Sequence, residues 1–409
     1  MKNKVRINVS GVISDENRFI LPWSGRGINY NDEDINLVIK AMREVDPLTQ
    51  GPYQEEFERI FSEYHENIPS FATSSGAGAL EISADLIDIK PGDEVIIPAH
   101  TYVASAIPYA RRGAKLVWAD IDIDTRIVTA ETIVSKITSK TKAVIPVHLY
   151  GLCAEMEEII SLADKHNIWV IEDCAQALGS SYKGKKCGTF GHIAIYSFHA
   201  QKNITTLGEG GMIITNVPEF VKKIPGLRHN GHRNYSDGRE YYWRPAMVDV
   251  DFDMDNVWPH NFSIGEIQCA VGINLMKRLD EINNRRFEKA KYVTNSLADC
   301  YELDFQKIPK NSTHVYSNLC AKYESEKKGI DRNNLIRILA YEFKIQPVVQ
   351  NNPLYRYPLM IKAGFGDSEC PNTDKFFDNM LSLPFYEWFS EKQLDYLITS
   401  SRKAVGKLR

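Results

Sequence analysis

Apolar runs and helical repeats alternate along the chain between about residues 55 and 216. Residues 55–64 have helical spacing, with Phe57, Ile60, Phe61 and Tyr64 on one face. Short apolar runs follow, each bounded by Gly, Pro or Asp, with helical stretches between them: 94–97, 115–118, 142–148 and 168–171. Runs that are apolar on both faces are typical of central strands in a parallel sheet covered by helices. The pattern therefore predicts an α/β fold.

The pattern changes after residue 228. Residues 229–261 are rich in Asn, Asp, Tyr and Trp and indicate a long ordered loop, which in compact enzymes is usually functional or interfacial. Residues 262–292 return to helical spacing and indicate a bridge between domains. The remainder mixes strand-like runs with helical ones: 313–323, 345–349, 332–342 and 391–400. We expect a large α/β domain over 30–275 and a small α+β domain over 276–409, with residues 1–29 packing near the small one.

Composition and charge narrow the class of protein. With 409 residues, of which 43% are hydrophobic and 25% charged, the chain has the composition of a soluble globular enzyme. Its 49 Lys and Arg against 53 Asp and Glu give a net charge of −4, which does not favour binding to nucleic acid or to an anionic membrane. No apolar stretch approaches the roughly 20 residues of a membrane span. The first residues lack the apolar region of a signal peptide.

The seven cysteines are scattered along the chain, and no two of them form a C-x-x-C pair. Such spacing is typical neither of a disulfide framework nor of a zinc site. We therefore expect no disulfide framework, no zinc site and no other bound metal, and we predict a reducing, cytoplasmic location.

The run Ser197–Gly211 contains the most informative residue, Lys202. This lysine follows an apolar, β-rich segment and precedes a glycine cluster, so it is expected on a rigid edge where a ligand can approach. Lysine is the side chain that forms Schiff bases with aldehyde cofactors. Asp173 follows the apolar strand 168–171 and lies at its carboxyl end, where α/β proteins place ligands. An aspartate at such a position can also simply cap a helix. A lysine and a carboxylate together are what pyridoxal phosphate (PLP) requires, the carboxylate at its ring nitrogen.

Two further segments have a functional and a purely structural interpretation. Thr73–Ala79 enters a helix, whose first N–H groups favour an anion such as a phosphate, but the same residues form an ordinary helix cap. They are not a Walker A loop, and no G-x-G-x-x-G motif occurs. Tyr102 could stack on a cofactor ring or belong to the core. His148 and His199 could each be catalytic or purely structural, and a single histidine near a strand is more often structural.

Taken together, these segments resemble a known family. From about residue 20 to 400 the chain is similar to the PLP-dependent sugar aminotransferases of the DegT/StrS type, which have fold type I. The matching segments occur in the family's order: Gly51–Phe57, Ser74–Gly76, Pro98–Ala104, Pro146–Gly151, Glu172–Gly179, Ser197–Gly211, Asn261–Gly272, Arg278–Asn283 and Leu383–Tyr386. The resemblance implies a fold type I PLP-transferase, whose large domain contains a mostly parallel seven-stranded sheet.

The resemblance also implies a role for each matching residue around the cofactor ring. Lys202 matches the lysine that bonds covalently to PLP, and it serves as the catalytic proton carrier. Asp173 matches the acid at the pyridine nitrogen. Gln176 matches an amide near the phenolic oxygen, and Tyr102 matches the aromatic residue that stacks on the ring.

The phosphate site is implied in the same way. The backbone at Gly76 and Ala77, with the Ser197 hydroxyl, would hold the phosphate. Asn261 matches an asparagine that the neighbouring subunit contributes, which implies a homodimer. The chain departs from the family pattern twice. Ala77 replaces the usual threonine, so one phosphate-binding hydroxyl is absent, and Leu207 is an extra residue that changes the turn after the lysine.

The implied activity is transamination of a keto-sugar to an amino-sugar by a ping-pong mechanism. Glutamate is the implied donor, and a nucleotide-linked sugar is preferred to a sugar phosphate as acceptor. The loop 229–261, the stretch 350–356 and the residues Arg228, His229 and Arg233 are candidate substrate contacts, although the three side chains fit a plain basic surface equally well. The alternatives are a sugar dehydratase, in which histidine replaces the lysine, and a non-catalytic PLP-binding regulatory module.

Overall fold

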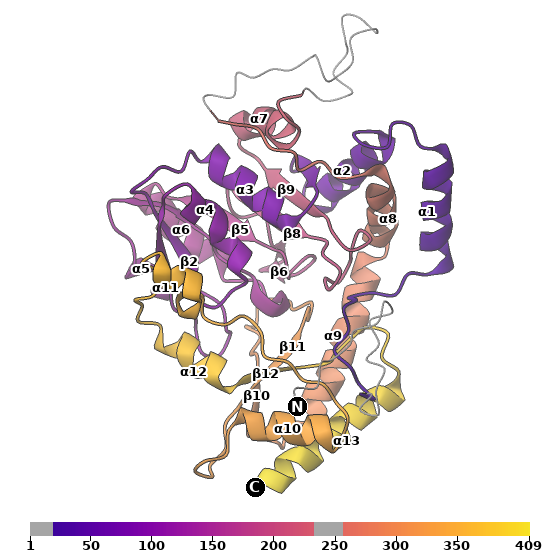
Figure 1. The fold of residues 1–409 in the computed structure, drawn as a ribbon, viewed down its shortest axis with the longest axis vertical. Helices are drawn as coiled ribbons and strands as arrows, with labels where there is room; N and C mark the ends of the chain where they lie inside the picture. The colour runs from indigo at the N-terminus through magenta and orange to yellow at the C-terminus, as the bar shows by residue number, and fades with distance from the viewer. Residues whose placement is uncertain (1–18, 233–256) are drawn as a thin grey trace, which may run out of the picture.

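A seven-stranded sheet forms the centre of the computed structural model, which describes residues 19–232 and 257–409 (Figure 1). The strands lie in the order β1-β9-β8-β5-β4-β2-β3. Only β9 runs antiparallel to its neighbours, because its pairings with β1 and β8 are antiparallel and the others are parallel. The prediction of a mostly parallel seven-stranded sheet is confirmed. The strands are β1 (Ser70–Thr73), β2 (Glu94–Pro98), β3 (Lys115–Ala119), β4 (Thr141–Val144), β5 (Trp169–Asp173), β8 (Ile193–Ser197) and β9 (Gly211–Thr215).

Helices cover both faces of this sheet, so its strands are buried on both sides. One hydrophobic core packs α3, α4 and α7 against side chains such as Val95 and Ile97. The other packs α2, α5, α6 and α8 against the opposite face, where Ile96 points. These helices are α2 (Pro52–Tyr64), α3 (Gly76–Leu86), α4 (Ile107–Arg111), α5 (Ala130–Val134), α6 (Met156–His166), α7 (Pro218–Arg228) and α8 (Glu266–Lys277). Helix α1 (Asp32–Glu44) contacts α8, where Asn274 and Arg278 both donate to Asp34.

A second, three-stranded antiparallel sheet lies at the other end of the molecule, next to α10 and α13 (Figure 1). A third core forms around it and includes Leu21, whose peptide nitrogen donates to Lys344. Helix α9 (Leu279–Ser296) follows α8 and extends to this end of the molecule. The remaining elements are β10 (Leu303–Phe305), β11 (Leu319–Tyr323), β12 (Met380–Leu383), α10 (Arg332–Tyr341), α11 (Pro358–Lys362), α12 (Pro371–Asn379) and α13 (Glu391–Leu408), with a hairpin of β6 (Ser181–Tyr182) and β7 (Lys185–Lys186). The division into domains at residue 275 stays a prediction.

Three expectations differ from the structure. The strand expected over 313–323 begins only at Leu319, because residues 313–318 turn toward the large sheet. The long helix expected over 262–292 is two helices that meet at Arg278. The scattered cysteines, which were not expected to form a disulfide framework, include one joined pair, Cys153 and Cys187, 34 positions apart. Their pairing depends on tertiary packing, which cysteine spacing alone does not reveal.

The remaining expectations concern the loop and the membrane. Residues 233–256 of the predicted loop, and with them Arg233, lie outside the described residues. The two ends of that loop lie side by side, since Asn230 donates to His260 and His229 pairs with Asn261. Among the described residues, no helix is both long and apolar enough to cross a membrane.

Candidate active site

Lys202 and Asp173 come together at the carboxyl ends of two neighbouring strands. Asp173 is the last residue of β5, which pairs in parallel with β8, and Lys202 follows the end of β8. Lys202 is partly buried, and desolvation of its amine lowers the pKa of that amine. The negative charge of Asp173 acts on the same amine and opposes that shift. The fold therefore brings a partly buried lysine close to a carboxylate at the edge of the sheet, where the sequence predicted both groups.

A short turn holds the Asp173 carboxylate in place. Asp173 is only 4% exposed, and its Oδ2 accepts a hydrogen bond from Ser105 Oγ at 2.7 Å. Its Oδ1 accepts one from the Ala175 nitrogen at 3.1 Å. Ser105 ends the turn η1 (Val103–Ser105), which Tyr102 precedes, and the Tyr102 ring is 64% exposed. One turn thus positions both the aromatic side chain and the carboxylate, a link through Ser105 that the sequence analysis missed.

The first turn of α3 lies against the end of β8. The Ser75 hydroxyl caps the helix by accepting from the Gly78 nitrogen at 3.0 Å, while the amides of Gly76 and Ala77 belong to a first turn that has no partners within the helix. A Cβ atom on Gly76 would lie 3.0 Å from Ser197 Cβ, which explains why glycine occupies this position. The helix amides and the Ser197 hydroxyl therefore converge on one small region suited to an anion.

The side chain of Gln176 is fixed through its oxygen. Its Oε1 accepts hydrogen bonds from the Tyr150 nitrogen at 2.9 Å and from Ser317 Oγ at 3.4 Å. Within residues 19–232 and 257–409, no hydrogen-bond partner holds its Nε2 group. These bonds also determine which way the amide is turned. The donor end of Gln176 is consequently free for a ligand.

Asn261 lies beside the start of α3 in its own subunit. Its side chain is exposed, and the carbonyl of the next residue, Phe262, accepts from the Ser74 nitrogen at 2.7 Å. The contribution of Asn261 to a second subunit stays a prediction. Leu207, the extra residue, adopts a left-handed conformation with φ 63° and is exposed. The turn after Lys202 accommodates Leu207 in this conformation. The segment before the turn keeps the hydrogen bond that the Lys202 nitrogen donates to the His199 carbonyl.

Another close approach to the lysine was missed at the sequence stretch Ser24–Gly27. The Gly27 nitrogen donates to the Ala200 carbonyl at 2.6 Å, and a Cβ atom on Gly27 would lie 1.9 Å from the Lys202 carbonyl oxygen. The two glycines of this stretch, separated by one residue, were the only clue that the backbone must pass so close.

Several other candidate residues are already engaged. His148 contacts Glu172 through Nε2 at 3.0 Å and accepts from the Ala154 nitrogen through Nδ1, so neither ring nitrogen is available to a ligand. Arg228 is 3% exposed and pairs with Glu58, which makes it a buried structural residue rather than a surface anion site. The basic residue of the stretch 350–356, Arg356, pairs with two aspartates, Asp374 and Asp378. His229 contacts Ser263, and exposed His199 faces Glu209.

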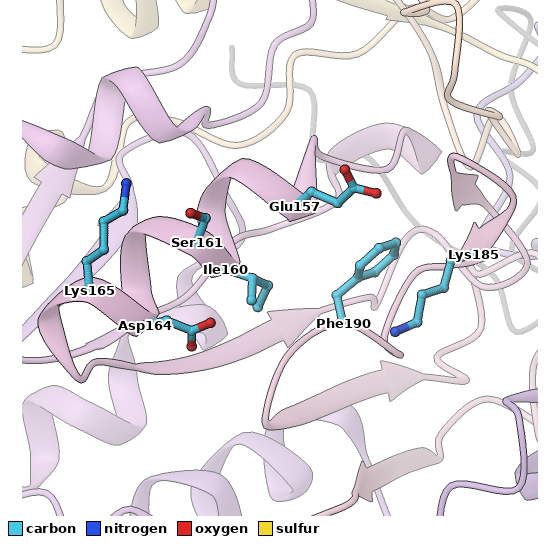
Figure 2. A pocket seen from close by; sticks show the side chains of 7 residues that line it. All are labelled: Glu157, Ile160, Ser161, Asp164, Lys165, Lys185 and Phe190. Carbon is cyan, nitrogen blue, oxygen red and sulfur yellow. The ribbon is translucent and has the colours of Figure 1, made fainter.

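A separate pocket lies beside α6 and shares none of the predicted site residues (Figure 2). Its lining comes from α6, from β7 and from Phe190, over whose ring the Lys185 ammonium lies at 4.9 Å. The predicted PLP site is therefore not this pocket.

The residues at the strand edge fit PLP on their own geometry. They offer a buried amine for the aldehyde, a hydrogen-bonded carboxylate for the ring nitrogen, an unpaired amide donor, and helix amides for the phosphate. Together with the mostly parallel sheet, they define a PLP-dependent enzyme of fold type I.

Comparison with known proteins identifies the family. Residues 29–402 match the DegT/DnrJ/EryC1/StrS aminotransferase family, to which the chain belongs. It is 30% identical, over 88% of its length and 91% of the relative, to the spore coat polysaccharide biosynthesis protein SpsC of Bacillus subtilis. The protein is accordingly a PLP-dependent sugar aminotransferase, and the predictions of family, enzyme class and cofactor are confirmed.

Solved structures agree with this assignment. An aminotransferase from Psychrobacter cryohalolentis superposes with a TM-score of 0.86 at 26% identity, covering 95% of this chain and 100% of the other. The PLP form of the putative sugar aminotransferase Spr1654 from Streptococcus pneumoniae superposes with a TM-score of 0.84 at 25% identity, covering 95% and 99%.

Proposed function

We propose that the protein transfers an amino group from glutamate to a keto-sugar, preferably a nucleotide-linked one, by a ping-pong mechanism. The observation that carries the proposal is the partly buried, desolvated Lys202 near Asp173, because a lysine at this position favours amino transfer over the dehydration that a histidine variant performs. His199 lies three residues earlier and is not a substitute for that lysine. We also propose a homodimeric, cytoplasmic enzyme in which Asn261 completes the phosphate site of the second subunit.

When bound, PLP supplies an electron sink that stabilises negative charge on the donor's α-carbon. Lys202 carries the proton between that α-carbon and the cofactor's C4′ position, and its lowered pKa keeps more of the amine in the neutral, basic form. Asp173 holds a proton on the ring nitrogen, since Ser105 and Ala175 fix its carboxylate. Both halves of the reaction depend on these two groups.

The other residues bind and orient. The Gly76 and Ala77 amides and the Ser197 hydroxyl would hold the phosphate, with the Ala77 amide serving in place of the missing threonine hydroxyl. Gln176 would offer its free Nε2 group to the phenolic oxygen, and the exposed Tyr102 would stack on the pyridine ring.

The test separates the two half-reactions. The PLP-loaded protein is first mixed with glutamate alone, and loss of the cofactor's absorbance measures the donor step. The aminated protein is then offered two sets of keto-sugars, nucleotide-linked and sugar phosphate, and recovery of the absorbance measures the acceptor step. We expect recovery with the nucleotide-linked set and none in Lys202→Ala. Recovery with sugar phosphates only would overturn the substrate class, and a dehydrated product formed without glutamate would overturn amino transfer.

A further inference from the structure

The turn of residues 314–318, which lies between β10 and β11, contacts three segments in or near the proposed PLP site. The Val315 nitrogen donates to the Gly151 carbonyl at 2.9 Å, and the Val315 carbonyl accepts from Asn203 Nδ2 at 3.0 Å. Asn203 directly follows Lys202. The Ser317 hydroxyl donates to Gln176 Oε1 at 3.4 Å. This turn therefore contacts the neighbours of the catalytic lysine and one of the cofactor-binding side chains.

Arg286 on α9 holds this turn from behind. Its Nε and Nη2 atoms donate to the Tyr316 carbonyl at 3.0 and 2.6 Å, and Nη2 also donates to the Ser317 carbonyl at 3.2 Å. The guanidinium is 2% exposed and lies over the Phe385 ring at 5.3 Å. Burial lowers the pKa of Arg286 to about 10, so the side chain is still charged at neutral pH. A charged donor makes stronger hydrogen bonds to these carbonyls than a neutral one.

The backbone at Tyr316 meets the backbone at Tyr150 and Gly151, and both tyrosines have an unfavourable conformation. Tyr316 has φ 46° and Tyr150 has φ 64°, which place two bulky residues in the left-handed region. A Cβ atom on Gly151 would lie 2.8 Å from the Tyr316 nitrogen, so the turns pack backbone against backbone. Residues in such conformations persist only where their surroundings hold them. Arg286 binds the carbonyl of one of them, and Gln176 accepts from the nitrogen of the other.

We propose that Arg286 is a positioning residue for the cofactor. By holding the Tyr316 and Ser317 carbonyls it directs the Ser317 hydroxyl to Gln176 Oε1, which turns Gln176 Nε2 toward the phenolic oxygen of PLP. The inference rests on the place proposed above for Gln176. A donor at the phenolic oxygen withdraws negative charge and so lowers the pKa of the chromophore that PLP forms with Lys202.

The test is a pH titration of the absorbance of the PLP-loaded protein without substrates. Ser317→Ala removes one hydroxyl and leaves the buried guanidinium in place, whereas Arg286→Lys keeps the charge but loses the forked geometry. Both variants, like Gln176→Ala, are expected to raise the chromophore pKa, by about one unit for the loss of one such hydrogen bond. Arg285→Ala is the matched control, because Arg285 pairs with Glu281 and Glu387 instead and should titrate as the wild type does.

Double variants and kinetics separate positioning from mere support of the fold. In Gln176→Ala/Arg286→Lys the arginine substitution should add no further shift, since the group through which it acts is gone. The kcat of both half-reactions should fall about five- to tenfold in Ser317→Ala while the glutamate KM stays constant. Wild-type titration in both Ser317→Ala and Arg286→Lys, with a shift in Gln176→Ala, would overturn the inference. Wild-type titration in Gln176→Ala would instead overturn the place of Gln176 in the proposed function.

Discussion

Gly211 of β9 packs against the start of α3, where we propose that the phosphate binds, and Gly211→Ala should weaken cofactor binding. A Cβ atom built on Gly211 would lie 2.4 Å from the Ser75 carbonyl carbon and 2.5 Å from the Gly76 nitrogen. These distances are about 1 Å shorter than ordinary van der Waals contact. The atoms that it would meet belong to the backbone, so no side chain can rotate away to make room.

The sheet prevents Gly211 itself from moving. Gly211 pairs with Thr73 of β1 on one side and with Ser197 of β8 on the other. The start of α3 must therefore shift by on the order of 1 Å, and such overpacking destabilises folded proteins by about 1–3 kcal/mol. The same shift would displace the Gly76 and Ala77 amides from the proposed position of the phosphate. The loss of one charge-assisted hydrogen bond, about 1.5–3 kcal/mol, corresponds to 10- to 150-fold weaker PLP binding.

The assay is titration of the PLP-free protein with PLP, followed by absorbance, together with thermal unfolding of both forms. Gly406→Ala in α13 is the control, because a Cβ atom there meets nothing within 4 Å and alanine favours a helix. It should bind PLP normally and unfold at the wild-type temperature or slightly higher. Wild-type PLP affinity and wild-type unfolding temperature in Gly211→Ala would refute the argument that this backbone contact is rigid.

Other predictions follow from the same geometry. Ser105→Ala removes the donor to Asp173 Oδ2, a hydrogen bond to a charged group, so kcat measured with glutamate should fall about tenfold or more. Lys202→Met should raise the unfolding temperature of the PLP-free protein, because desolvation lowers the pKa of Lys202 below 10.5 in the folded state. Below that lowered pKa, the folded protein holds a desolvated positive charge that methionine does not carry. That gain should disappear as the pH rises through 10.5. Burial lowers the pKa of three histidines to about 3: His65, His100 and His314. Denaturant titrations should therefore show that the free energy of unfolding falls as the pH drops from 6.5 toward 3. The fall should be less steep when one of these histidines is replaced by phenylalanine.

The regular part of the fold was predictable from the sequence for a physical reason. Central strands of a parallel sheet are buried on both faces, so they appear as continuous apolar runs whatever surrounds them. The runs at 94–97, 115–118 and 168–171 accordingly lie in or beside β2, β3 and β5. The ligand edge was predictable as well, because in α/β proteins it lies at the carboxyl ends of the strands, where Asp173 and the segment of Lys202 occur.

Contacts between distant segments were not predictable in this way. The partner of Arg228 is Glu58, 170 residues away, and no local pattern shows that the arginine is buried. The turn of residues 314–318 was expected to be part of a strand, but contacts with Gly151 and Asn203 hold it in another conformation. The pairing of Cys153 with Cys187 depends likewise on how two loops meet.

The sequence by itself determined the chemical groups of this protein: a lysine, a carboxylate and a helix start at strand ends, whose resemblance to a known family indicated the cofactor and the class of reaction. Only the tertiary structure decided how those groups are held. Ser105 donates a hydrogen bond to Asp173, and the backbone at Gly27 and Gly211 packs closely against neighbouring backbone. Arg286 binds the turn of residues 314–318, from which Ser317 donates to Gln176. The reason is that the chemical type of a side chain is a local property, whereas its orientation and pKa arise from neighbours that the folding of the whole chain brings to it.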